Sequence, residues 1–158
     1  GIMLSDNLQT SRSPVAERGN HNNGLYNIDG RGAYPPQATG FIEFTGNPAD
    51  MGRFRTASLR NVGVTAPYFH DGSAATLEDV LDHYANAGRV IAEGPYAGDG
   101  SKNPYKDTMI VGFKASDQEI ADIIAFLNSL TDETFLTNPD YADPWPEGHA
   151  ASINRVMP

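Results

Sequence analysis

The sequence predicts a mainly α fold with few helices and long ordered loops. Two stretches, at about 76–86 and 117–130, carry apolar residues with the three- and four-residue spacing of a helix that buries one face. The chain contains 16 Gly and 11 Pro, which indicates many turns, and no two neighbouring segments alternate as a β-hairpin would. Its length of 158 residues suits a single domain.

The first helix is expected from about Thr76 to Asn86, with Gly88 as its stop. Thr76 is a suitable N-cap, and the acidic Glu78 and Asp79 lie in the first turn, where the helix dipole favours negative charge. The apolar stripe that we expect to be buried consists of Leu77, Val80, Leu81 and Tyr84. The opposite, polar face is expected to consist of Asp79, Asp82, His83 and Asn86.

The second helix is expected from about Asp117 to Leu130. Ser116 and Glu119 have the spacing of a capping box, in which each side chain bonds to the other residue's backbone N–H. Its apolar stripe consists of Ile120, Ile123, Ile124, Leu127 and Leu130. After Asp132 the periodicity is lost, which predicts a tail lying on a surface, with Trp145 as a candidate anchor.

Residues 1–56 lack sustained periodicity and are rich in Asn, Gly and Pro, as loops are. We expect this region to be ordered, because large apolar side chains recur along it and solvated linkers usually lack them. These anchors are Leu25, Tyr26, Ile28, Tyr34, Phe41, Ile42 and Phe44.

The composition excludes several classes of partner. A formal net charge of −9 argues against nucleic acid and anionic membrane surfaces, which both require a cationic face. No apolar run approaches the length of a membrane span, so no membrane insertion is expected. The chain has no Cys, which excludes disulfides and any covalent haem attachment within these residues. Only 39% of residues are hydrophobic, so we expect a thin core that depends on a cofactor, a metal or another domain.

The most informative stretch reads LRNVGVTAPYFHDG over 59–72 and is followed by ATL at 75–77. Two further segments, HNNGL at 21–25 and AFLNSLT at 125–131, fit the same pattern. Together they resemble the C-terminal haem domain of the bacterial di-haem cytochrome c peroxidase and MauG family. Within that family, the segments around 25–35 and 44–46 resemble most closely the MauG-like branch that includes the di-haem enzymes of methanobactin biosynthesis.

The resemblance implies a cytochrome c-like haem domain over residues 1–158, a periplasmic location and two haem c groups in the intact protein. GIMLSD at 1–6 resembles the segment that follows the second C-x-x-C-H motif of the family. Both haem-attachment motifs and the N-terminal haem domain are therefore expected to lie upstream of these residues.

Tyr84 is the principal site residue that the resemblance implies. The family places the distal axial ligand of the second haem nineteen residues after the Thr of T-A-P-Y-x-H, and Tyr84 stands nineteen residues after Thr65. Peroxidases of the electron-accepting kind carry Met there, whereas the MauG branch carries Tyr. A phenolate is a hard anion that favours ferric iron, and a thioether favours ferrous iron. Helical periodicity alone favours the alternative, a core aromatic residue.

Other site residues also follow from the resemblance. Thr65 and Pro67 match positions whose backbone carbonyls bind calcium, although the family's third ligand, an upstream Asn, is absent here; an ordinary Pro-fixed turn is the alternative. We expect His70 to form hydrogen bonds near the haem edge without binding iron. Arg55 and Arg60 are candidates to pair with haem propionates, or alternatively with the many acidic residues of this chain.

The implied function is that of part of a di-haem, peroxidase-like oxidoreductase. It would use hydrogen peroxide to oxidise a substrate protein or a small electron donor, together with the upstream haem domain, and this piece alone is expected to be inactive. Copper involvement rests only on analogy with the methanobactin branch. The alternative is a non-enzymatic one, a c-type electron-transfer module or a calcium-stabilised interaction module.

Overall fold

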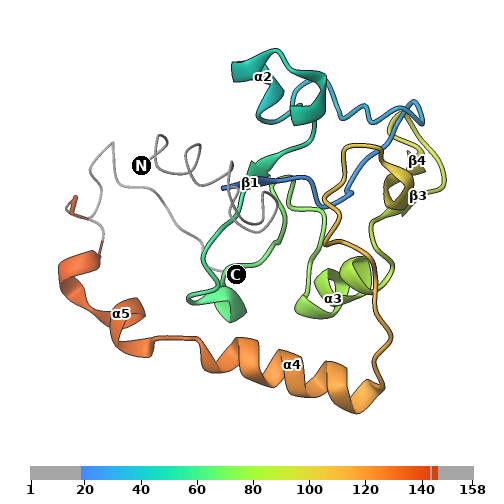
Figure 1. Cartoon of the computed structure of the whole chain (residues 1–158). Helices are drawn as coiled ribbons and strands as arrows, with labels where there is room; N and C mark the ends of the chain where they lie inside the picture. The colour runs from blue at the N-terminus through green and yellow to red at the C-terminus, as the bar shows by residue number, and fades with distance from the viewer. Residues whose placement is uncertain (1–18, 143, 146–158) are drawn as a thin grey trace, which may run out of the picture.

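The computed structural model describes residues 19–142, 144 and 145 (Figure 1). Few helices joined by long loops were expected, and this is confirmed. The α-helices are α2 (Ile42–Thr45), α3 (Leu77–Ala85), α4 (Asp117–Ser129) and α5 (Glu133–Thr137). Short 3-10 turns occur at η1 (Pro48–Asp50), η2 (Val62–Val64), η3 (Gly100–Lys102) and η4 (Pro139–Tyr141). The resemblance of segment 1–6 to the family lies outside the described residues.

The expectation that no strands would pair is wrong. Strand β1 (Asn20–His21) pairs antiparallel with β2 (Phe54–Arg55), and β3 (Val90–Ile91) pairs antiparallel with β4 (Gly98–Asp99). Each strand has two residues, too few to show the alternation that marks a strand in a sequence. The backbone hydrogen bonds of the two ladders hold long loops together.

The buried core is built mainly on loop residues. Leu25, Tyr26 and Tyr34 form its centre, with Ile28, Met51, Phe54, Phe69, Ile91 and Tyr96 packed against them. The backbone of these loops is held by buried amide side chains. One example is Asn103, whose Nδ2 donates to the Tyr26 carbonyl at 2.7 Å. The order expected over 1–56 is thus confirmed for residues 19–56, but the expected anchor Phe44 is wrong, since it is 84% exposed on α2.

Helix α3 forms because Thr76 caps it as expected. The Thr76 side chain accepts from the Asp79 N–H at 3.1 Å, and the Asp79 carboxylate accepts from the Thr76 N–H, which completes a capping box. Leu77 and Leu81 are buried as predicted. The assignment of His83 to the polar face is wrong, because His83 is only 6% exposed. Loop 22–25 and Phe69 pack against that side of α3. The spacing of residues along a helix cannot indicate which distant loops will contact it.

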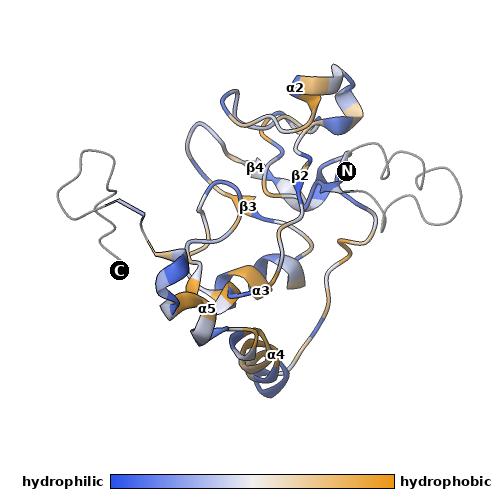
Figure 2. Cartoon of the chain, turned by 90° about the vertical axis from the view of Figure 1, so that its left-hand side faces the viewer, coloured by the Kyte–Doolittle hydropathy of each residue, from blue (hydrophilic) through white to orange (hydrophobic). Residues whose placement is uncertain are grey.

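Helix α4 lies along one edge of the molecule, below α3 in Figure 1. The expected capping box is present: the Glu119 N–H donates to the Ser116 hydroxyl, and the Ser116 N–H donates to the Glu119 carboxylate at 2.8 Å. Its C-terminal end is tied to the chain before η2, where the Asn61 N–H donates to the Leu130 carbonyl at 3.1 Å. The apolar stripe of α4, coloured orange in Figure 2, is only half-buried, and Phe126 is 59% exposed. This hydrophobic surface is therefore incompletely covered.

Two short helices were not predicted, α2 in the first loop region and α5 in the tail. Each is a turn or little more, and neither buries a residue, so neither produces an amphipathic pattern. Among the described residues, no helix has both the length and the apolar character needed to cross a membrane.

Candidate functional site

Tyr84 lies in the last turn of α3 and is half-buried. Its ring meets the ring of Phe69 edge-on, at a centroid distance of 6.3 Å, and the ring of His83 at 5.2 Å. The Tyr84 hydroxyl makes no hydrogen bond with any residue in the described part of the chain. The ring is therefore held by aromatic neighbours, while its oxygen stays available for another partner.

Phe69 is the residue that brings the 65–72 turn onto α3. It is half-buried and has a positive φ of 66°, a conformation that costs a non-glycine residue about 1 kcal/mol or more. The turn is closed by the Tyr68 N–H, which donates to the Ala74 carbonyl at 2.7 Å. This geometry places the Phe69 ring 4.7 Å from that of His83, so the turn and the helix share one aromatic contact.

His83 connects α3 to loop 22–25. Its Nε2 lies 2.9 Å from the Asn23 carbonyl, which can only accept, so Nε2 carries the proton and donates. Burial lowers the pKa of His83, against the opposing effect of that hydrogen bond, and the nearby Arg89 charge lowers it further. We therefore expect a neutral imidazole that fixes the helix beside the loop core.

The candidate calcium ligands lie in an exposed turn after η2. The turn is braced by the Tyr68 hydroxyl, which donates to the Val62 carbonyl at 2.9 Å. Neither the Thr65 nor the Pro67 carbonyl accepts a hydrogen bond from a described residue, so both oxygens remain available. Over the ranges that the structure describes, no group of three or more His, Cys, Asp or Glu side chains could hold a metal ion.

His70 and Arg55 line one pocket of about 460 Å³, which also contains Arg53. The His70 ring stacks on Phe54 at 3.5 Å, and desolvation lowers its pKa. His70 makes no hydrogen bond within the described part of the chain, so its expected role near a haem edge stays a prediction. Arg55 and Arg60 are exposed and form no ion pair with a described residue, and their expected pairing with haem propionates stays a prediction.

A second polar cluster, which the sequence did not suggest, joins Tyr26, Asp71 and Arg89. The buried Tyr26 hydroxyl donates to Asp71 Oδ2 at 2.7 Å, and Arg89 Nη2 donates to the same oxygen at 3.3 Å. The Arg89 guanidinium also lies over the Tyr26 ring, 4.6 Å from its centroid. Burial raises the pKa of Asp71, but hydrogen bonds from Ser73 and Tyr26 and the Arg89 charge outweigh it and leave that pKa below its ordinary value.

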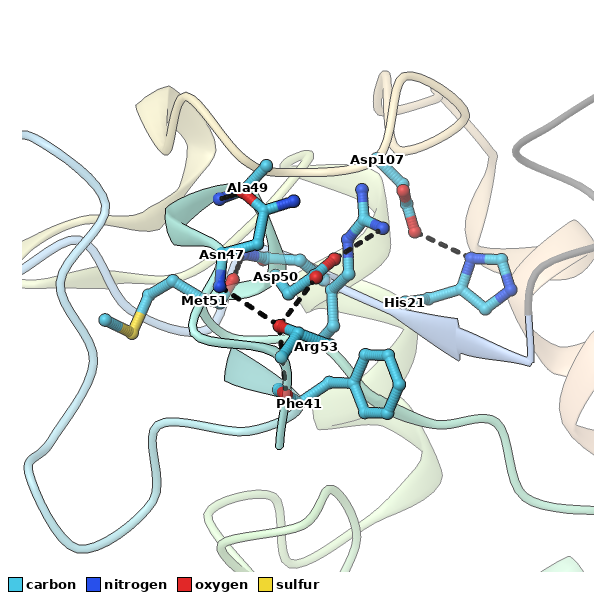
Figure 3. A network of polar contacts seen from close by, with 10 residues as sticks. His21, Phe41, Asn47, Ala49, Asp50, Met51, Arg53 and Asp107 are labelled. Carbon is cyan, nitrogen blue, oxygen red and sulfur yellow. Dashed lines mark hydrogen bonds and ion pairs between the residues drawn. The ribbon is translucent and has the colours of Figure 1, made fainter. Parts of the chain in front are cut away.

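A third polar contact joins β1 to the chain before α4 (Figure 3). His21 Nδ1 lies 2.6 Å from Oδ2 of the buried Asp107, whose N–H donates to the Asn22 carbonyl. On the neighbouring turn, Arg53 Nη1 donates to Asp50 Oδ1 at 3.1 Å. The His21–Asp107 contact fastens the start of loop 22–53 to the chain before α4, whereas the Arg53–Asp50 pair is local to the turn at the other end of that loop.

Acid is expected to weaken the fold through Asp71. A carboxyl whose pKa is lowered in the folded state stabilises that state above its unfolded pKa, about 4, and the stabilisation is lost as the pH falls through the folded value. Urea unfolding at a series of acidic pH values should show a shallower loss of stability in Asp71→Asn than in the unsubstituted protein. Asp122→Asn, at an exposed carboxylate bonded to Gln118, is the control, and equal slopes in all three proteins would contradict the prediction.

Comparison with known proteins identifies the family. No family model matches the chain. It is 38% identical over 92 residues, 58% of its length, to the cytochrome-c peroxidase IdrP1 of Denitromonas iodatirespirans, and 32% identical over 104 residues, 66% of its length, to the methylamine utilization protein MauG of Methylorubrum extorquens. The crystal structure of a MauG-like protein associated with microbial copper homeostasis superposes with a TM-score of 0.78 at 52% identity, covering 87% of this chain. The chain belongs to the MauG and di-haem peroxidase family.

The chain spans 21% and 24% of the lengths of these two curated relatives and 39% of the solved MauG-like chain. Membership of the MauG and peroxidase family implies haem c as the cofactor. The described residues fit such a group. The surface around α4 and the preceding segment exposes large apolar side chains that a haem face could cover, Met109, Val111, Phe113 and Phe126. Phe113 also adjoins the end of α3, since its N–H donates to the Ala85 carbonyl at 3.1 Å.

Proposed function

We propose that residues 1–158 are the C-terminal cytochrome c-like domain of a di-haem, peroxidase-like oxidoreductase, and that they supply the distal side of its second haem. The observation that carries the proposal is Tyr84. Its ring is fixed by Phe69 and His83, and its hydroxyl is unengaged by any described residue. An oxygen held in this way is suited to be an axial ligand.

When bound, the haem supplies one-electron chemistry at its iron. The contribution of Tyr84 is a phenolate oxygen, a hard donor that stabilises ferric and higher oxidation states and lowers the reduction potential. The half-covered apolar stripe of α4 and its neighbours Val111 and Phe113 would exclude water from the macrocycle. This donor set favours the retention of oxidising equivalents over service as a high-potential electron entry point.

The cationic side chains have a separate role in this proposal. Arg55 and Arg60 are free to pair with haem propionates, because neither is engaged by an acid in the described residues. His70, in the same pocket as Arg55, would donate to or accept from the polar edge of the group. The Thr65 and Pro67 carbonyls would bind calcium at the boundary with the upstream haem domain.

In the intact protein, hydrogen peroxide would be the oxidant, and a substrate protein or a small electron donor would be oxidised in the periplasm. The peroxidase and MauG relatives support this reaction class. A connection with copper rests only on similarity to the solved MauG-like protein, which is associated with microbial copper homeostasis.

Substitution of Tyr84 in the haem-loaded, full-length protein tests the proposal. Tyr84→Phe should remove the phenolate ligand and change the low-spin EPR signal and the optical spectrum, whereas Tyr84→Met should restore a sixth ligand and raise the reduction potential. Tyr141→Phe, at an exposed tyrosine that packs on Phe135, is the matched control. An EPR signal unchanged in Tyr84→Phe would exclude Tyr84 as the ligand.

A pyridine haemochrome assay of the full-length protein as purified decides between the enzymatic and non-enzymatic functions. Two haems per protein are expected. A protein without haem would contradict the peroxidase proposal and leave the calcium-stabilised interaction module.

A further inference from the structure

The cluster of Tyr26, Asp71 and Arg89 lies outside the ligand set proposed above, and it combines three features. The Tyr26 side chain is 8% exposed, so its phenol is shielded from solvent. Its hydroxyl donates to a carboxylate at 2.7 Å. Its ring contacts two further tyrosine rings, those of Tyr34 at 5.4 Å and Tyr96 at 6.0 Å.

We propose that Tyr26 is a one-electron redox site, at which the phenol gives up an electron while its proton moves to Asp71. The O–H bond of Tyr26 breaks, a bond forms between that proton and Asp71 Oδ2, and the products are a neutral tyrosyl radical and a protonated Asp71. The electron passes to a one-electron oxidant that the haem group forms from hydrogen peroxide. That a haem forms this oxidant from hydrogen peroxide rests on the function proposed above.

The hydrogen-bond partners explain why Tyr26, and not its neighbours, has this role. Oxidation of a phenol makes it a strong acid, so a nearby base lowers the free energy required. Tyr34 donates to Asn22 Oδ1 at 2.8 Å, and an amide oxygen is a poor proton acceptor. The Tyr96 hydroxyl accepts from Gln37 Nε2 at 2.7 Å. Within this ring cluster, Tyr26 alone has a carboxylate partner in the described part of the chain.

Arg89 is the ion-pair partner of the carboxylate that is to accept the proton. In the resting state its charge and that of Asp71 offset one another, which favours the ionised, proton-accepting form of Asp71. After oxidation the proton stays within the cluster, whose net charge rises by one as the electron leaves. Return of an electron therefore lets the proton move back over the same short hydrogen bond and regenerate Tyr26.

The neighbouring rings give the oxidised site a connection to the surface. Tyr96 is half-buried, and its hydroxyl contacts the exposed Gln37. An electron from a donor beside Tyr96 would thus have one ring contact to cross before it reaches Tyr26.

The test is freeze-quench EPR of the haem-loaded, full-length protein after addition of hydrogen peroxide. A tyrosyl signal is expected, identified by its narrowing in protein grown with ring-deuterated tyrosine. Tyr26→Phe, which keeps the packed ring, should reduce that signal to background, and Asp71→Asn should lower its yield several-fold. Tyr141→Phe should leave it unchanged. Far-UV circular dichroism checks that each variant is folded.

The outcomes separate this inference from the proposed function. If peroxide changes the haem optical spectrum but no tyrosyl signal forms, or if the signal persists in folded Tyr26→Phe, Tyr26 is not the redox site. A full yield in Asp71→Asn would overturn the role of Asp71 as the proton acceptor. If the haem spectrum does not respond to peroxide, the proposed function fails. In that case photo-oxidation of the same protein by a ruthenium(III) complex tests Tyr26 directly, with the same variants and the same criteria.

Discussion

Gly52→Ala is expected to lower the free energy of unfolding by about 4 kcal/mol, combining overpacking with backbone strain. Gly52 has a positive φ of 73°, which disfavours any residue with a Cβ. A Cβ at this position would also overlap the ring of Tyr34 and lie 2.7 Å from Asn22 Nδ2. Both neighbours are buried in the loop core, so moving either of them aside would disrupt its packing. Urea unfolding followed by far-UV circular dichroism measures the loss.

Gly30→Ala is the matched control for this substitution. Gly30 has a nearly equal φ of 71°, but a Cβ there would meet nothing within 4 Å. Only the backbone term remains, so the expected loss is about 1 kcal/mol. Equal losses in the two variants would show that the close packing around Tyr34 contributes nothing.

Asn22→Ala is expected to cost about 3 kcal/mol, because it leaves several buried polar groups without partners. Asn22 is fully buried. Its Nδ2 donates to the Met51 carbonyl at 2.9 Å, and its Oδ1 accepts from the Gly24 N–H at 2.9 Å and from the Tyr34 hydroxyl at 2.8 Å. The same unfolding measurement applies.

Asn47→Ala provides the comparison for an amide at the surface. Asn47 caps η1, where its Oδ1 accepts from the Ala49 N–H at 3.1 Å, and water can replace it there. We expect a loss of about 1 kcal/mol or less. A loss as large as that of Asn22→Ala would indicate that burial is not the cause of the effect.

Gly52→Ala and Asn22→Ala bear on function as well as stability. The loop core that Gly52 and Asn22 hold together includes Tyr26, and the adjoining Asn23 carbonyl receives the hydrogen bond of His83. Loosening this core should therefore disturb both the Tyr26–Asp71 contact and the seating of α3, on which Tyr84 depends.

The two main helices could be predicted from the sequence because their causes are local. A cap, a dipole-compatible first turn and a three-to-four spacing all lie within one stretch of chain. Helix α3 follows the predicted N-cap Thr76, and α4 begins at the predicted Asp117. The short α2 and α5 and the two-residue strands depend on contacts made elsewhere, and their own sequences carry little signal.

Some features of the candidate site could likewise be predicted from the sequence, and others could not. The TAPYFH turn and the register from Thr65 to Tyr84 can be followed along the sequence, as can the absence of Cys. The burial of His83, the exposure of Phe44 and the half-covered stripe of α4 could not be predicted, because each depends on which distant loop does or does not pack there.

The sequence by itself therefore determined the main helices and the family resemblance, since both are encoded by spacing along the chain. Only the tertiary structure decided where the core lies and which polar groups meet. Tyr26, Asp71 and Arg89 come from three separate loops, and a 2.7 Å hydrogen bond between the first two exists only after those loops close over Leu25 and Tyr34. Loop closure is a long-range event, and local spacing carries no record of it.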